Sequence, residues 1–593
     1  MHISELPYYV KWFIMGVVIG VVAGLSALTF YLALKFMEFI FMLKLVGYEI
    51  PEPLGEGGSL SYIFHVGHVW LIPLSTMLGG LLSGLIVYTW APEAEGHGTD
   101  AAINAFHRLQ GRIRRRIPPI KLIASAITIG SGGSAGREGP TAQLSAGIGS
   151  LIADLLGLST EDRRIAVAVG IGAGIGSIFK APIGGAILAA EILYKRDFES
   201  EVLFPALVAS AVGYVIFSSV VGFTPIFGYY IGVFNPLRLP LYIMLGVIDG
   251  LMAVLYVKTF YTVHDSFKRW RVNNYVKPVI GGAVTGLIGL LAPEVLGTGY
   301  GWLNLVEFNR VNAFISPIVA LPPLVILVML PFLKIVATSF SIGSGGSGGV
   351  FAPGIVIGAF TGFNIWLIFH HLIPGLTPDP APFVIISMLA FFGAAAKAPL
   401  AVMFMVIEMT GSYQLLPGAM IAVAVAYLIS GDYTIYRAQV PTRRDSPVHA
   451  DEYREPLLME IRVSECRLIK EPVAHIDENT SVVLNRMLRY RYTALPVIDT
   501  GGKFIGVVNL HDISGGKGRV RDYVKAMRYV TPESTLYDVM SLMSEAGTTW
   551  VPVVNDGVFL GLLTIENMNK VYTDKLRATR QLTQQLTRTE SSN

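Results

Sequence analysis

A glycine-rich segment that occurs twice limits this chain to a duplicated architecture. Residues 130–140 read GSGGSAGREGP, and residues 343–353, which lie 213 positions later, read GSGGSGGVFAP. The related segments KAPIGGAILAAE at 180–191 and KAPLAVMFMVIE at 397–408 are separated by 217 positions. Two pairs of similar segments at nearly the same separation indicate that one long unit has been duplicated.

The part of the chain that carries these segments has the composition of a membrane protein. Hydrophobic residues make up 52% of the chain and charged residues 15%, whereas about a quarter of the residues in soluble proteins are charged. Glycine and proline interrupt the apolar runs at 130–133, 180–182, 343–349 and 397–399. Irregular backbone at membrane depth survives only where protein or a water-filled cavity covers it. We therefore predict an all-α polytopic membrane domain of two inverted repeats whose broken helices re-enter the membrane.

The distribution of basic residues predicts the orientation of this domain. Lysine and arginine cluster in short loops at 111–116, 194–198 and 267–271, and at Arg443 and Arg444 where the membrane part ends. The positive-inside rule places these loops, and the soluble part that follows them, in the cytoplasm. The stretch GRIRRR at 111–116 is either this topology signal or a contact to anionic lipid. The N-terminus lacks the pattern of a cleavable signal, and we expect the plasma membrane.

After about residue 440 the composition becomes that of a soluble protein. Two similar units follow, each with a short strand, a helix and two further strands joined by a GG or DG turn. The single cysteine, Cys466, excludes an internal disulfide and is expected to be structural. The net charge of +3 does not indicate a nucleic-acid partner. The predicted divisions are the membrane domain 1–440 with repeats at about 8–220 and 236–432, the linker 441–456, the soluble units 457–516 and 517–575, and a polar tail 576–593.

The repeated glycine-rich segment is suited to bind an anion. A helix that begins just after such a turn directs unpaired N–H groups and its positive dipole end at whatever lies there. Inverted duplication brings two such helix ends toward one point near the middle of the membrane. Glu138 stands in this segment, and as a carboxylate it can occupy the anion position, which makes it a candidate gate. The alternative is that Glu138 pairs with the neighbouring Arg137, although adjacent residues on a helix do not face each other.

The motifs GREGP at 136–140, GVFAP at 349–353 and the two KAP segments resemble those of the CLC family of chloride channels and proton-coupled chloride exchangers. The two soluble units resemble the paired CBS domains of that family. The resemblance implies a homodimer in which each subunit has its own pore, with Glu138 as the external gating glutamate. It also implies that the backbone amides of Val350 and Phe351 coordinate the central chloride. Tyr436 falls where the family's pore tyrosine donates its hydroxyl, or else it is a packed interfacial tyrosine.

Two departures from the family pattern bear on mechanism. The first chloride-binding motif is represented by GHGTD at 96–100, where His97 replaces a serine; either its imidazole or only backbone amides such as that of Gly98 contact the anion. Ile192 stands where the family's exchangers carry an internal proton-accepting glutamate. Its neighbour Glu191, mirrored by Glu408, is read as a buried helix-capping or loop-anchoring acid rather than a proton relay.

The soluble units carry segments that resemble a nucleotide-binding pattern. GVVNLHD supplies Asn509 and Asp512, and GLLTIEN supplies Thr564 and Asn567. A carboxylate accepts hydrogen bonds from both ribose hydroxyls, whereas an amide does so less well, so the second site is the weaker match. The units therefore either bind an adenine nucleotide or serve only as a dimerisation platform.

The sequence thus predicts chloride-selective anion transport gated by Glu138 and modulated by cytoplasmic CBS domains, with no cofactor required. Ile192 favours uncoupled, channel-like conductance, and a proton-coupled chloride antiporter is the alternative. A cation transporter with CBS regulation is a further alternative, but it calls for clustered intramembrane acids. We predict no enzyme and no metal site, because the apolar part lacks an HExxH motif.

Overall fold

The computed structural model describes residues 6–449 and 454–590. These residues form two compact units, which divide between Val448 and His449. The division falls within the predicted linker 441–456, of which 450–453 lie outside the described residues. Each unit is described by itself below.

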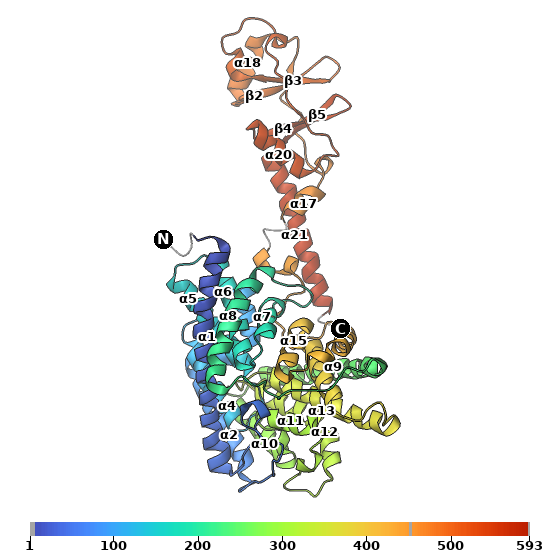
Figure 1. Ribbon diagram of the computed structural model, residues 1–593. Helices are drawn as coiled ribbons and strands as arrows, with labels where there is room; N and C mark the ends of the chain where they lie inside the picture. Colours follow the sequence, from blue (N-terminus) through green and yellow to red (C-terminus); the bar gives the residue numbers. More distant parts are fainter. Residues whose placement is uncertain (1–5, 450–453, 591–593) are drawn as a thin grey trace. The chain divides into compact units, whose positions relative to one another are not determined.

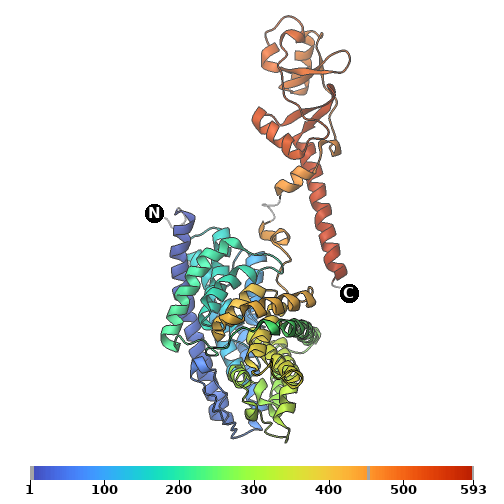
Figure 2. The same cartoon turned by 45° about the vertical axis from the view of Figure 1, so that its right-hand side comes forward.

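The first unit is built from α-helices, as Figure 1 shows. The first predicted repeat contains α1 (Tyr8–Glu38), α2 (Leu71–Trp90), α3 (Thr99–Arg108), α4 (Ile117–Gly130), α5 (Glu138–Leu155), α6 (Thr160–Ile178), α7 (Pro182–Glu191) and α8 (Ser200–Val221). The second contains α9 (Leu239–Arg269), α10 (Lys277–Leu291), α11 (Tyr300–Glu307), α12 (Pro323–Gly343), α13 (Phe351–Leu372), α14 (Ala381–Ala396), α15 (Pro399–Thr410) and α16 (Leu416–Ile429). In Figures 1 and 2, α1 runs beside α8.

The lengths of these helices agree with the predicted broken architecture. Six apolar segments of the described chain are long enough to cross a membrane, namely Tyr8–Val46, Leu71–Trp90, Ser200–Val221, Pro236–Arg269, Pro323–Gly343 and Phe351–Leu372. Other apolar helices, including α4, α7, α14 and α15, have only 10–17 residues, which is less than the roughly 20 residues that a full span requires. The described part of the chain therefore contains helices long enough to cross a membrane and helices too short to do so.

The two glycine-rich segments occupy equivalent places in the two repeats. The first connects α4 to α5 and the second connects α12 to α13, and in both repeats the helix before the segment ends at its first glycine. The two segments run antiparallel where they meet: the Gly136 N–H donates to the Gly349 carbonyl at 2.8 Å, and the Gly349 N–H donates to the Gly136 carbonyl at 2.6 Å. Antiparallel contact between equivalent segments is what an inverted repeat requires.

The acids that follow the KAP segments join the repeats reciprocally. The Glu191 carboxylate accepts hydrogen bonds from the N–H groups of Leu400 and Ala401, at 3.2 and 2.7 Å, in the first turn of α15. The Glu408 carboxylate accepts from Ile183 and Gly184, at 3.1 and 2.8 Å, in the first turn of α7. These N–H groups have no partner within their own helix. The prediction that both acids cap helices is confirmed.

The second unit contains the predicted strand and helix pattern. Its elements are α17 (Arg454–Glu460), β1 (Ala474–His475), α18 (Thr480–Tyr490), β2 (Ala494–Ile498), β3 (Phe504–Asn509), α19 (Leu510–Ile513), α20 (Leu536–Ala546), β4 (Trp550–Asn555), β5 (Val558–Thr564) and α21 (Ile565–Glu590). β2 lies between parallel β1 and antiparallel β3, with Val497 opposite Gly506, and β4 pairs antiparallel with β5, with Trp550 opposite Thr564. The predicted polar tail 576–593 belongs to α21 as far as Glu590, and 591–593 lie outside the described residues.

The two halves of this unit differ at their first strand. In the second half the expected strand is reduced to a single parallel bridge between Val530 and Val553. The DG turn forms as predicted, with positive φ angles of 47° at Asp556 and 81° at Gly557, which match the two-residue hairpin turns preferred by such pairs. Cys466 is buried among Ile461, Val463 and their neighbours in the apolar core of this half.

Candidate functional site

Glu138 is the first residue of α5, and its carboxylate lies at the start of α13. Its side chain is almost fully buried, and its Oε1 accepts a hydrogen bond of 2.5 Å from the backbone N–H of Phe351. Oε2 has no hydrogen-bond partner among the described residues. Phe351 lies 213 positions after Glu138, so the acid of one repeat rests on the equivalent helix start of the other. An unpaired N–H at a helix N-terminus favours negative charge, and this is the position an anion would take.

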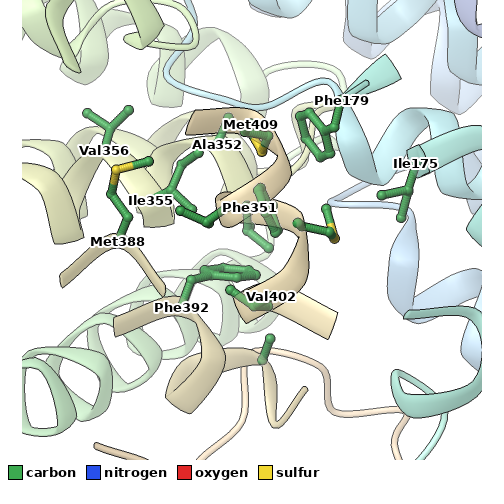
Figure 3. Packing of buried hydrophobic residues seen from close by; sticks show 14 of the residues in the cluster. Ile175, Phe179, Phe351, Ala352, Ile355, Val356, Met388, Phe392, Val402 and Met409 are labelled. Atoms are coloured by element: carbon green, nitrogen blue, oxygen red, sulfur yellow. The ribbon is translucent and has the colours of Figure 1, made fainter. Parts of the chain in front are cut away.

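The start of α13 is held in place by aromatic packing. The Phe351 ring stacks on Phe179 with a centroid distance of 4.9 Å and meets the edge of Phe392 at 4.7 Å; Figure 3 shows this cluster. The Tyr256 hydroxyl donates to the Val350 carbonyl at 3.0 Å. The amide that contacts Glu138 is therefore fixed before any ligand arrives. Tyr256 was not predicted, because nothing local in α9 distinguishes it from other aromatic residues.

Arg137 does not pair with Glu138. Its guanidinium forms two hydrogen bonds to the carboxylate of Glu56, at 3.1 and 2.5 Å, and the exposed fractions of the two side chains are 3% and 1%. It also lies 5.3 Å from the ring centroid of Tyr300. The alternative in which Glu138 pairs with Arg137 is therefore wrong. Glu56 was missed because it comes from a distant polar loop that carries no motif.

His97 and Tyr436 come together, as the predicted site requires. Their ring centroids are 5.5 Å apart, and both side chains are nearly fully buried. His97 Nδ1 has no hydrogen-bond partner among the described residues, and Nε2 lies 3.7 Å from a carboxylate oxygen of Asp100. Gly98 precedes α3 with φ of +84°, and a Cβ there would lie 2.6 Å from the Gly139 carbonyl. The histidine therefore has a free ring nitrogen in this region, and its contact with an anion stays a prediction.

Two buried lysines reinforce the loops around the site. Lys121 in α4 donates to the carbonyls of Ala94 and Gly96, at 3.0 and 2.7 Å, and Lys334 in α12 donates to those of Val295 and Gly297, at 2.8 and 3.0 Å. Both lysines are fully buried, and neither contacts a carboxylate in the described parts of the chain. They lie 213 positions apart. That separation inside apolar runs is a signal that could have revealed them from the sequence.

The surroundings of Ile192 contain backbone and amide groups. Its side chain is buried, and its carbonyl accepts a 3.0 Å hydrogen bond from the Gln439 amide. The same amide donates to the carbonyls of Tyr194 and Ala396, at 3.3 and 3.0 Å. An isoleucine cannot carry a proton, and Gln439 does not replace a carboxylate. Neither side chain can therefore carry a proton at this position.

The predicted nucleotide-binding residues form two local pairs. The Asn509 amide donates to the Asp512 carboxylate at 2.9 Å, and Lys525 contacts the same carboxylate at 2.8 Å. The hydrogen bond from Lys525, supported by that from Asn509, lowers the pKa of Asp512. In the second pair, the Thr564 hydroxyl accepts from the Asn567 N–H at 3.3 Å.

The cavity of about 560 Å³ in this unit lies elsewhere. Its walls include His475, Arg486, Tyr490 and Tyr492 rather than the four predicted residues.

Repeats whose equivalent helix starts, those of α5 and α13, meet at one carboxylate are typical of membrane transport folds. The sequence profile of the family described as voltage gated chloride channel matches residues 79–431, and the CBS domain profile matches 463–515 and 520–574. The chain belongs to this CLC family and carries a CBS pair, so it transports anions across a membrane. Members of the family are transporters and not enzymes.

Known proteins align with most of the chain. An uncharacterized protein of Methanocaldococcus jannaschii is 30% identical over 432 residues, which is 72% of this chain and 95% of that protein. The H(+)/Cl(−) exchange transporter ClcA of Vibrio campbellii is 29% identical over 431 residues, 70% of this chain and 86% of that protein. The crystal structure of a slow cyanobacterial Cl−/H+ antiporter has a TM-score of 0.61 and 24% identity, covering 73% of this chain and 97% of that one. The predicted family and fold class are confirmed.

Proposed function

We propose that this protein exchanges chloride for protons across its membrane, with Glu138 as the group that serves both ions. The observation that carries the proposal is the hydrogen bond from the Phe351 N–H to the Glu138 carboxylate. Relatives whose names describe H+/Cl− exchange support it. The antiporter alternative is therefore preferred to the channel-like reading that Ile192 first suggested.

The geometry links the two ions through competition for one donor. When Glu138 is ionised, its carboxylate accepts the Phe351 N–H and occupies the place of an anion. A chloride that binds this N–H must displace the carboxylate. Once the displaced carboxylate has taken a proton, it competes less well with chloride for the N–H, because hydrogen bonds to charged groups are stronger than those to neutral groups. Backbone amides can hold chloride without a full positive charge that would bind it too tightly to leave. The amides of Val350 and Gly98, with His97 and Tyr436, are the other proposed ligands.

Uncoupled chloride conductance is the second candidate function. The observation that favours it is Ile192, which stands where the family's exchangers carry an internal proton-accepting glutamate; its side chain is buried and its carbonyl contacts the amide of Gln439. In that case Glu138 would still gate the pathway, but protons would not be moved stoichiometrically.

Flux measurements distinguish the two functions. The full-length protein is reconstituted in liposomes under a chloride gradient with the voltage clamped by a potassium ionophore, and chloride efflux and external pH are recorded together. Exchange predicts that protons move uphill while chloride leaves. Chloride efflux without proton movement would establish uncoupled conductance, and no chloride flux from folded protein would refute both candidates. Glu138→Gln is the control that should remove proton movement.

We propose further that the CBS pair binds an adenine nucleotide through Asn509 and Asp512, with Thr564 and Asn567 as the weaker second pair. The resemblance of GVVNLHD to a nucleotide-binding pattern supports this assignment, and the ribose hydroxyls would take the places that Asn509 and Lys525 hold on the Asp512 carboxylate. We also propose a homodimer in the plasma membrane with the CBS pair in the cytoplasm, on the basis of the family and the basic loops. Light scattering that gave a monomeric mass for active, detergent-solubilised protein would contradict the dimer.

A further inference from the structure

A charged cleft opens beside the C-terminal half of α9, and neither Glu138 nor Phe351 lines it. Its volume is about 530 Å³, and its walls come from α9, from the loop after α7 and from the segment after α16. Six charged residues line it, namely Lys195, Lys258, Asp265, Arg269, Asp432 and Arg437. Cations therefore outnumber carboxylates in its wall by four to two.

The two carboxylates are already occupied by arginines. Asp265 accepts two hydrogen bonds of 2.9 Å from Arg437, and Asp432 pairs with Arg196, which does not line the cleft. Among the described residues, the side chains of the remaining three cations contact carbonyls and a ring.

Lys195 lies 3.5 Å from the Asp432 carbonyl, Arg269 donates to the Asp265 carbonyl at 3.2 Å, and Lys258 lies over the Tyr433 ring at 4.8 Å. Within the described chain these three cations make no ion pair. They are therefore available to an anion.

The cleft continues an apolar, exposed face of the membrane unit. Leu251 and Leu255 of α9 are 59% and 39% exposed, and they share a helix face with Lys258 because residues three and four apart are neighbours on a helix. α16 packs against α9 and exposes Leu428 by 77% at its end, just before Asp432. α9 belongs to a segment long and apolar enough to cross a membrane. Its exposed leucines are thus suited to contact acyl chains.

From this juxtaposition we propose that the cleft binds the phosphate of an anionic membrane lipid between Lys195 and Lys258, which lie against the neighbouring residues Asp432 and Tyr433, with Arg269 farther along the cleft. The acyl chains follow Leu251 and Leu255. Basic pockets between membrane helices attract such headgroups, and phosphate oxygens form strong hydrogen bonds with lysine and arginine. The continuous apolar strip favours a lipid over a soluble anion, since a soluble anion would gain nothing from it. Tyr433, 44% exposed, supplies an aromatic ring of the kind common at membrane interfaces.

The test compares lipid selectivity in bilayers of phosphatidylcholine that contain the full-length protein. Electron spin resonance measures how strongly spin-labelled phosphatidic acid associates with the protein relative to spin-labelled phosphatidylcholine. Lys195→Gln/Lys258→Gln should lower this selectivity, by about fivefold for each lysine. The matched control Arg112→Gln/Arg115→Gln removes the same charge from the exposed basic loop and should leave the selectivity unchanged. Asp432→Asn should raise it, because it removes a negative charge from the cleft.

Each other outcome overturns the proposal. Equal losses in the two double variants would mean general attraction to a basic surface, and no loss in Lys195→Gln/Lys258→Gln would mean that the cleft holds no lipid phosphate. Binding of inorganic phosphate that is lost in Lys195→Gln/Lys258→Gln, together with unchanged lipid selectivity in the same variant, would identify a soluble anion as the ligand. If the lysine variant does not fold, the result for Asp432→Asn tests the proposal, because misfolding cannot raise the selectivity for phosphatidic acid. An unchanged selectivity in Asp432→Asn would then count against the site.

Discussion

The ion pair between Arg137 and Glu56 allows a test of what stabilises the segment that carries Glu138. The pair is buried, with exposed fractions of 3% and 1%, and it is joined by two hydrogen bonds. Glu56→Gln leaves the guanidinium buried without a countercharge, immediately before Glu138. Breaking a buried pair from one side costs about 3–5 kcal/mol, whereas replacing both charges by neutral groups is often nearly neutral. We therefore expect the double variant Glu56→Gln/Arg137→Gln to be more stable than either single variant.

Reversible unfolding of the wild type, the two single variants and the double variant in one detergent completes a double-mutant cycle. The single variants should each lose about 3–5 kcal/mol of unfolding free energy, and the double variant should lose clearly less than their sum. Glu93→Gln is the matched control, because Glu93 pairs with Arg114 at the surface, with both side chains nearly half exposed, and such pairs contribute about 0–1 kcal/mol. Additive losses in the cycle would refute the energetic coupling between Arg137 and Glu56.

Four further expectations address the gate, the helix cap, the nucleotide site and the cysteine. Glu138→Gln removes a charged acceptor that competes with chloride, and hydrogen bonds to charged groups contribute about 1.5–3 kcal/mol. Chloride flux at neutral pH should therefore rise on the order of tenfold and lose its pH dependence. Unchanged pH dependence in the flux assay would contradict the gate. Glu191→Gln should lower the unfolding free energy by about 1–3 kcal/mol without changing the ratio of chloride to protons, and an altered ratio would indicate a proton relay. Because Lys525 and Asn509 hold the pKa of Asp512 below its ordinary value, the carboxylate is charged at neutral pH, so nucleotide binding measured by calorimetry at pH 7.5 should weaken in Asp512→Asn, and unchanged binding would contradict the site. Burial raises the pKa of Cys466 to about 11, so maleimide should label the folded protein at pH 7.5 far more slowly than the denatured protein, and equal rates would place the thiol at the surface.

Local chemistry made several features predictable from the sequence. The roles of Glu191 and Glu408 as caps could be inferred because an acid and a proline-started helix recur at the same spacing in both repeats. The turn at Asp556 and Gly557 depends on two residue types that tolerate positive φ. Such features need only the residue and its immediate neighbours.

Partners across the fold could not be predicted in this way. Glu56 lies 81 positions from Arg137, and Tyr256 lies 94 positions from Val350. Which of many acids or tyrosines reaches a given group depends on how helices pack, and no local pattern encodes that choice. The same holds for the reduced first strand near Val530, where pairing with Val553 is limited to one bridge.

The amino-acid sequence by itself determined the duplication, the division into membrane and soluble units, and the residue types of the gate, because composition, spacing and glycine chemistry are properties of short segments. Only the tertiary structure decided that the Glu138 carboxylate rests on the Phe351 N–H of the other repeat while Arg137 turns to Glu56. The 213-residue separation made the two positions equivalent without saying that they touch. Contact between them arises from the antiparallel meeting of the two glycine-rich segments, which exists only when both repeats have folded around each other.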